Sequence, residues 1–187
     1  MISAKLGHFL DRPLSIIAKR ITLSPNTVTF IGFFITGIAA LSIPFDLLLG
    51  GLLMVLGGLF DALDGVIARV NNRGTKFGAF LDSTLDRYSD SFIFLAIAWY
   101  FFRAGNNAGV IFSLGSLVGA LLISYARARA EGLGIACSVG LMERPERVVL
   151  LAFGCITGWL YPVVVSLFFF SHFTVLQRMV HVYRGTK

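Results

Sequence analysis

Long apolar runs, separated by connections of only a few residues, fill most of this 187-residue chain and leave few folds open to it. An α-helix needs roughly 20 apolar residues to cross the hydrocarbon core of a bilayer. Charged residues make up 14% of the chain, whereas an ordinary soluble domain carries about 25%. The sequence therefore predicts an all-α, polytopic membrane protein with no room for a soluble domain.

Proline and capping residues indicate where the runs begin and end. Ser24 is suited to cap a helix that has Pro25 in its first position. Pro145 opens the fifth run, and we expect Tyr161 and Pro162 to end it. We therefore predict a single membrane domain over residues 1–187 with six transmembrane helices, at about 25–43, 47–69, 76–102, 108–130, 145–160 and 163–184.

The first 20 residues differ from the rest, because apolar and basic positions alternate there at roughly helical spacing. This pattern is typical of an amphipathic helix on a membrane surface, so we predict a juxtamembrane helix over residues 1–20. Their mixed and basic character also argues against a cleavable signal peptide. Two cysteines, Cys137 and Cys155, have neither metal-ligand spacing nor the pattern of a disulfide framework.

Basic residues gather at alternate connections, and this distribution predicts how the protein lies in the membrane. One side carries Lys5, Arg12, Lys19, Arg20, Arg69, Arg73, Lys76, Arg127, Arg129, Arg144, Arg147, Arg178, Arg184 and Lys187. The other side has Arg103 alone. Because cytoplasmic loops carry the excess of lysine and arginine, we expect both termini on the cytoplasmic side of a cell membrane. The net charge of +6 then faces an anionic leaflet, and nucleic acid is not an expected partner.

Five aspartates fall within the second and third predicted spans: Asp61, Asp64, Asp82, Asp86 and Asp90. A carboxylate at the centre of a membrane helix costs about 2.5 kcal/mol or more, so such a cluster indicates a functional site. The first two share one helix face, and Asp82 and Asp86 share another. The short connection at 71–74 would bring these helices side by side, so four carboxylates would converge near the cytoplasmic boundary.

Unpaired carboxylates at this spacing repel one another, and a divalent cation removes the conflict. Carboxylate oxygens suit a hard ion, which favours Mg²⁺ or Mn²⁺ as the cofactor. Pairing of the aspartates with nearby basic residues is the alternative, and the candidates are Arg69, Arg73, Lys76 and Arg87. A divalent-cation transporter could also use such a cluster, although the polar positions gather at one boundary instead of spreading through the spans.

Residues 61–86 read Asp-x-x-Asp-Gly-x-x-Ala-Arg, then eight residues, then Gly-x-x-x-Asp-x-x-x-Asp. This stretch resembles the signature of the CDP-alcohol phosphotransferase family at each specified position: Asp61, Asp64, Gly65, Ala68, Arg69, Gly78, Asp82 and Asp86. The six-span layout and residues 24–29 are also similar to that family. The resemblance implies a membrane enzyme that transfers the phosphatidyl or archaetidyl group of CDP-diacylglycerol or CDP-archaeol to an alcohol and releases CMP.

The resemblance also implies roles for the signature residues. The predicted metal ligands are Asp61, Asp64, Asp82 and Asp86. Of these, Asp86 is also the predicted catalytic base, which takes the proton of the attacking hydroxyl. The predicted CDP-binding residues are Asp64, Gly65, Ala68, Arg69, Gly78 and Asp82. For the glycines and Arg69, helix packing and a snorkelling side chain are the alternatives.

A second basic cluster, at the ends of the fourth and sixth spans and the start of the fifth, bears on the acceptor. Several arginines would be redundant for an uncharged alcohol, whereas guanidinium groups match the oxygens of a phosphate. These segments resemble phosphatidylinositol-phosphate synthases and their archaeal counterparts, which implies an inositol phosphate acceptor held by Arg127, Arg147 and Arg178. The first of these positions can be lysine in that family.

Several points stay open in the sequence. The cluster could instead be ordinary loop charge paired with Glu131, Glu143 and Glu146. Glycerol 3-phosphate, used by phosphatidylglycerol-phosphate synthases, is the second candidate acceptor. Asp90 lies outside the signature, and it could pair with Arg87 or with a neighbouring helix. The glycine-rich spans and the family resemblance predict a homodimer.

Overall fold

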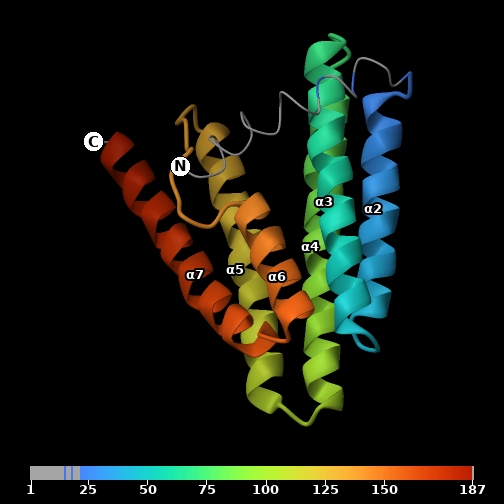
Figure 1. Ribbon diagram of the computed structural model, residues 1–187. Coiled ribbons are helices and arrows are strands. Elements are labelled where there is room, and N and C mark those ends of the chain that lie inside the picture. The colour runs from blue at the N-terminus through green and yellow to red at the C-terminus, as the bar shows by residue number, and fades with distance from the viewer. Residues whose placement is uncertain (1–14, 16–17, 19–21, 187) are drawn as a thin grey trace.

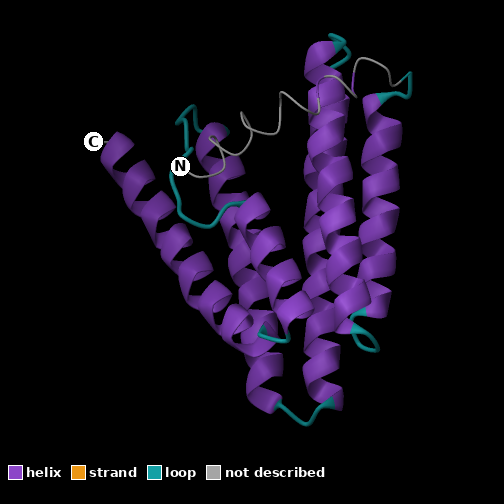
Figure 2. Cartoon of the chain, in the orientation of Figure 1, coloured by secondary structure: helices purple, strands orange, loops and turns teal. Residues whose placement is uncertain are grey.

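The structure, a computed structural model, describes Ser15, Ala18 and residues 22–186, and this part of the chain contains helices and no strand. The helices are α2 (Pro25–Ser42), α3 (Leu47–Val70), α4 (Lys76–Arg103), α5 (Asn107–Glu131), α6 (Arg144–Thr157) and α7 (Leu160–Gly185) (Figures 1 and 2). The all-α prediction is confirmed. The predicted amphipathic helix over 1–20 lies, apart from Ser15 and Ala18, outside the described residues.

Successive helices run in opposite directions, so the connections collect at two ends of the bundle (Figure 1). The start of α2 and the end of α7 lie toward the same end, together with the α3–α4 and α5–α6 connections (Figure 1). This arrangement gathers the predicted site segments at one end of the molecule.

Four helices, α2, α3, α5 and α7, are long and apolar enough to cross a membrane. Large apolar side chains also cover the outside of the bundle, with Leu41 75% and Phe45 79% exposed. Soluble monomers rarely expose apolar patches of this extent. The protein is therefore a multi-pass membrane protein. α4 and α6 are not among these four apolar helices, because α4 carries charged residues and α6 has only 14 residues.

Side-chain caps fix where several helices begin. The hydroxyl of Ser24 accepts a hydrogen bond from the backbone N–H of Thr27 at 3.2 Å, with Pro25 in the first turn. Asp46 caps α3 through the N–H of Leu49 at 3.0 Å, and α4 is capped by its preceding threonine. These polar residues therefore satisfy the backbone donors that a helix start leaves without intrahelical partners.

The boundary between the last two helices differs from the prediction. α6 ends at Thr157, because Gly158 takes a left-handed conformation with φ of 75°. Pro162 lies in the first turn of α7, where its missing N–H leaves no intrahelical bond unmade. The proline that was expected to end one helix instead belongs to the start of the next.

Each helix packs against two neighbours, which closes a ring in the order α2, α3, α6, α7, α5, α4 and back to α2. The expectation that α3 and α4 lie side by side is wrong, because α2 packs against both and the two helices make little backbone contact with each other. Side chains from α3, α4 and α6 therefore meet across the interior of the ring, and the apolar core fills the rest.

Candidate functional site

Three aspartates from two helices form a compact group. One carboxylate oxygen from each of Asp61, Asp64 and Asp82 lies within 4.8 Å of the others. Asp64 is only 6% exposed, and its Oδ2 atom has no hydrogen-bond partner in the described part of the chain. A buried acceptor without a partner is costly unless a ligand completes it. The donor set is entirely carboxylate, so it fits a hard divalent cation such as Mg²⁺ or Mn²⁺.

Close packing of α2 on α3 fixes the position of this group. A Cβ atom at Gly57 would lie 2.4 Å from Oγ1 of Thr36, so the two helices approach at a distance that only glycine permits. The hydroxyl of Thr36 donates to the carbonyl of Gly32 at 2.9 Å. Because α2 also packs on α4, it is the common support for the two helices that carry the carboxylates.

The two signature glycines have different surroundings. At Gly65, the only atom of the described residues that an added Cβ would meet is Nη1 of Arg69, at 3.3 Å, which leaves room for a ligand beside α3. At Gly78, it would lie 2.8 Å from Oδ1 of Asn26 and 3.0 Å from Oγ1 of Thr75. Part of the space next to Gly78 is therefore taken by Asn26, an α2 residue of the 24–29 stretch that resembles the family, to which the sequence assigned no role of its own.

Arg144, the first residue of α6, joins the carboxylates of α3 and α4. Its Nη1 atom lies 2.6 Å from Oδ2 of Asp61 and 3.0 Å from Oδ1 of Asp86, and its Nε atom lies 3.6 Å from Oδ1 of Asp90. Asp86, predicted as a fourth metal ligand, is not part of the three-carboxylate group and faces this guanidinium instead. The positive charge of Arg144 therefore lies between the carboxylate of α3 and those of α4.

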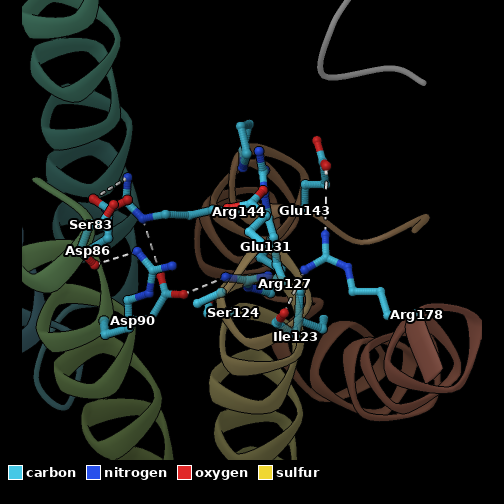
Figure 3. A pocket seen from close by; sticks show the side chains of 14 residues that line it. Ser83, Asp86, Asp90, Ile123, Ser124, Arg127, Glu131, Glu143, Arg144 and Arg178 are labelled. Atoms are coloured by element: carbon cyan, nitrogen blue, oxygen red, sulfur yellow. Dashed lines mark hydrogen bonds and ion pairs between the residues drawn. The ribbon is translucent and has the colours of Figure 1, made fainter. Parts of the chain in front are cut away.

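A cavity of about 470 Å³ extends from Asp86 toward α7. Figure 3 shows Asp86 and Asp90 on one side of it and Glu143 with Arg178 on the other. Five arginines and four carboxylates line it: Arg87, Arg127, Arg144, Arg147, Arg178, Asp86, Asp90, Glu131 and Glu143. Such a density of guanidinium groups favours an anionic ligand.

The three predicted acceptor arginines all line this cavity. Arg127 is exposed and bonds to Glu131 at 2.8 Å. Arg147 is 2% exposed, and its Nη2 atom lies 2.6 Å from Oδ2 of Asp90. Arg127 and Arg147 therefore each already have a carboxylate partner.

Arg178 is also 2% exposed, and backbone carbonyls hold most of its guanidinium. Its Nε atom donates to the carbonyl of Val139 at 2.9 Å and its Nη1 atom to that of Ile123 at 2.5 Å. Glu143 lies 3.8 Å away, whereas Glu146, the other proposed carboxylate partner, has an oxygen to which no described residue donates a hydrogen bond. The three arginines therefore line one cavity, as predicted. Part of the alternative is also present, because Glu131 and Glu143 pair with two of them.

Two residues of the site were missed or left open. Arg144 was assigned to loop charge, yet its spacing of three from Arg147 places both on one face of a helix that begins at this point. Asp90 pairs with two arginines of α6, across the interior of the ring, and not with Arg87, whose guanidinium donates to the carbonyl of Ser83. The spacing signal was present for Arg144, whereas nothing in the sequence identified the partner of Asp90.

Comparison with known proteins gives a consistent result. Residues 22–182 match the family described as CDP-alcohol phosphatidyltransferase. The archaetidylinositol phosphate synthase of Methanothermobacter thermautotrophicus is 39% identical, over 91% of this chain and 89% of that protein. The phosphatidylinositol phosphate synthase of Mycobacteroides abscessus is 36% identical, over 83% of this chain and 72% of that protein.

Solved structures of the Mycobacterium tuberculosis phosphatidylinositol phosphate synthase have the same fold. With CDP-DAG bound, that structure superposes with a TM-score of 0.84 at 34% identity, covering 92% of this chain and 94% of that chain. In complex with manganese and citrate, the TM-score is 0.80 at 33% identity, covering 92% and 88%.

Proposed function

This chain belongs to the CDP-alcohol phosphatidyltransferase family, and from this we propose that it transfers the phosphatidyl or archaetidyl group of a CDP-lipid to inositol phosphate and releases CMP. One observation carries the proposal: Arg144 joins the three-carboxylate group to the arginine-lined cavity, because it contacts Asp61 of that group and lines the cavity beside Asp86. The relatives named for inositol phosphate products support the choice of acceptor. Membership of a transferase family decides against the divalent-cation transporter.

On the donor side, Asp61, Asp64 and Asp82 would hold Mg²⁺ or Mn²⁺, and the unpartnered oxygen of Asp64 supports this assignment. The bound ion would neutralise the CDP diphosphate and stabilise CMP as the leaving group. The nucleotide would lie along α3 and α4, next to Asp64, Gly65, Ala68, Arg69, Gly78 and Asp82. The CDP-DAG complex and the manganese complex of the mycobacterial enzyme are consistent with both assignments.

Asp86 would act as the general base. Its carboxylate lines the cavity, so an acceptor hydroxyl can reach it directly. Arg144 fixes the orientation of this carboxylate from 3.0 Å away. The hydroxyl would then attack the β-phosphorus in line, and the reaction would be accelerated mainly by positioning and electrostatics. Asp86 remains a proposed fourth metal ligand as well, and a variant described in the Discussion separates the two roles.

On the acceptor side, the phosphate would lie among Arg127, Arg147 and Arg178. Glycerol 3-phosphate also bears a phosphate and is the second candidate. The cavity of about 470 Å³ favours the larger polyol, because it has room for a six-membered ring between Asp86 and the arginines. Glu131 and Glu143, which line it, offer acceptors for the additional hydroxyl groups.

In the membrane, we propose that all six helices cross the bilayer, with the site and both termini on the cytoplasmic side. α4 runs from the end of α3 to the start of α5, and these two points lie at opposite ends of the bundle (Figure 1). α6 runs in the same way between α5 and α7. The excess of basic residues at the site end supports its cytoplasmic location. A homodimer in a cell membrane remains part of this proposal.

The decisive experiment measures CMP release by the purified chain in lipid nanodiscs. Turnover should require CDP-diacylglycerol or CDP-archaeol together with Mg²⁺ or Mn²⁺, should stop with EDTA, and should be fastest with inositol phosphate. Inositol and glycerol, which have no phosphate, serve as matched acceptors. Faster release with glycerol 3-phosphate would favour the second candidate, and no metal-dependent release with any acceptor would refute the proposal.

A further inference from the structure

Asp90 lies one helical turn beyond Asp86, outside the family signature, and the chemistry above does not use it. We propose that Asp90 is a positioning residue of the acceptor site, which fixes the guanidinium of Arg147 for the acceptor phosphate. This inference rests on the proposed function, because it concerns the phosphorylated acceptor of the same site.

Both oxygens of Asp90 face arginines of α6. Oδ2 lies 2.6 Å from Nη2 of Arg147, and Oδ1 lies 3.6 Å from Nε of Arg144. The Asp90 side chain is 11% exposed and lines the same cavity as the two arginines. A single carboxylate of α4 therefore sets the orientation of two cations that enter from another helix.

Arg147 is held on a second side as well. Its Nη1 atom donates to the carbonyl of Met142 at 3.3 Å, and the N–H of Met142 donates to the hydroxyl of Thr174 at 3.1 Å. Its Nε atom is buried and has no hydrogen-bond partner among the described residues. Asp90 and Met142 thus fix the plane of the guanidinium with two of its five N–H donors, and the Nε–H is among the donors left for a ligand.

The Asp90–Arg147 ion pair differs from a purely structural ion pair in its position. A structural pair would be buried away from the cavity, whereas both members of this one line it. Asp90 cannot itself bind the acceptor phosphate, because two anions repel. Its contribution to acceptor binding must therefore pass through the arginines, as carboxylates beside metal-ligating or substrate-binding groups commonly act.

The first test compares kinetic constants in the full chain in nanodiscs. Asp90→Asn keeps the shape and removes the charge, so the KM for inositol phosphate should rise by about 10- to 100-fold. The KM for CDP-diacylglycerol and the Mn²⁺ concentration for half-maximal stabilisation should stay within about twofold of wild type. Asp90→Glu should restore part of the acceptor affinity. Asp46→Asn, the same change at the opposite end of the bundle, is the matched control and should alter neither constant.

The second test asks whether Asp90 acts through Arg147. If it does, the double variant Asp90→Asn/Arg147→Gln should have an acceptor KM no higher than that of Arg147→Gln alone. Additive effects, or equal rises in both substrate KM values, would overturn the inference. If Asp90→Asn does not fold, Asp90→Ser takes its place, because it also removes the carboxylate, and an acceptor KM unchanged from wild type there also overturns the inference. Wild-type protein that releases no CMP with any phosphorylated acceptor would instead refute the proposed function.

Discussion

At the scale of single residues, Arg144 has the most consequential set of contacts. It reaches Asp61, Asp86 and Asp90 from the first position of α6, although α6 packs on α3 and not on α4. A buried charge is tolerated when it is paired and hydrogen-bonded. Here one guanidinium stabilises three carboxylates, and two of them, Asp61 and Asp86, are proposed metal ligands.

Replacing Arg144 with glutamine should therefore change how the protein responds to metal. Without the guanidinium, the three carboxylates repel one another, so the metal-free protein should melt at a lower temperature. The rise in Tm on adding Mn²⁺ should be larger than in wild type, because the ion no longer competes with a cation for Asp61. Thermal melts with and without Mn²⁺ measure both effects. Equal Mn²⁺ shifts in the two proteins would contradict the prediction.

Asp86→Asn separates the two roles proposed for that residue. An amide cannot take the proton of the attacking hydroxyl, so the rate of CMP release should fall by about 10²- to 10⁴-fold. Binding of the CDP-lipid, measured by its effect on Tm in the presence of Mn²⁺, should persist. Loss of this binding together with turnover would make Asp86 chiefly a metal ligand.

At the scale of helices, α2 is the support on which the carboxylates depend. Its close contact with α3 needs a glycine, because a Cβ at Gly57 would lie 2.4 Å from Thr36 Oγ1. The same helix packs on α4. Any change that separates α2 from α3 therefore also alters the distance from Asp61 and Asp64 to Asp82.

We expect Gly57→Ala to lower the free energy of unfolding by about 1–3 kcal/mol through overpacking. It should also weaken stabilisation by Mn²⁺, because the carboxylates move apart. Gly37→Ala in α2 is the matched control, since no other group of the residues that the structure describes lies within 4 Å of its added Cβ. Denaturant unfolding and Mn²⁺-dependent melting test both points. A Gly57→Ala protein as stable as the control would show that the contact yields easily.

The helices themselves were largely predictable, because each apolar run has its own start signal. Ser24 with Pro25 gave the start of α2 to the residue. The errors came where local signals conflict with packing, as at Pro162, which is compatible with the first turn of a helix as well as with its end. The neighbours of α3 and α4 were not predictable, because connection length does not say whether a third helix lies beside both. For the same reason the partners of Asp86 and Asp90 emerged only from the structure.

At the scale of the molecule, the alternating helices give the two ends of the bundle different chemistry. Among the described residues, the end that carries the site gathers nearly all the basic ones, whereas the other end has Arg103, whose guanidinium donates to the carbonyl of Pro44 at 3.1 Å. This asymmetry is the basis for placing the site at the cytoplasmic face.

A labelling experiment tests this orientation. Cysteines introduced by Ala104→Cys and by Thr186→Cys should react with a membrane-impermeant maleimide from opposite sides of sealed, oriented vesicles. Both positions are exposed, and the native Cys137 and Cys155 are buried, so the unaltered chain is the background control. Labelling of both positions from one side would refute the proposed six crossings.

The donor side and the acceptor side of the site come from different parts of the chain. The carboxylates proposed for the donor lie between residues 61 and 82, whereas most of the cavity wall on the acceptor side comes from α5, α6 and α7. A gene that acquires changes only in its second half could therefore adopt a different alcohol while inheriting an intact donor site. Related enzymes of one fold can in this way make lipids with different headgroups from the same activated lipid.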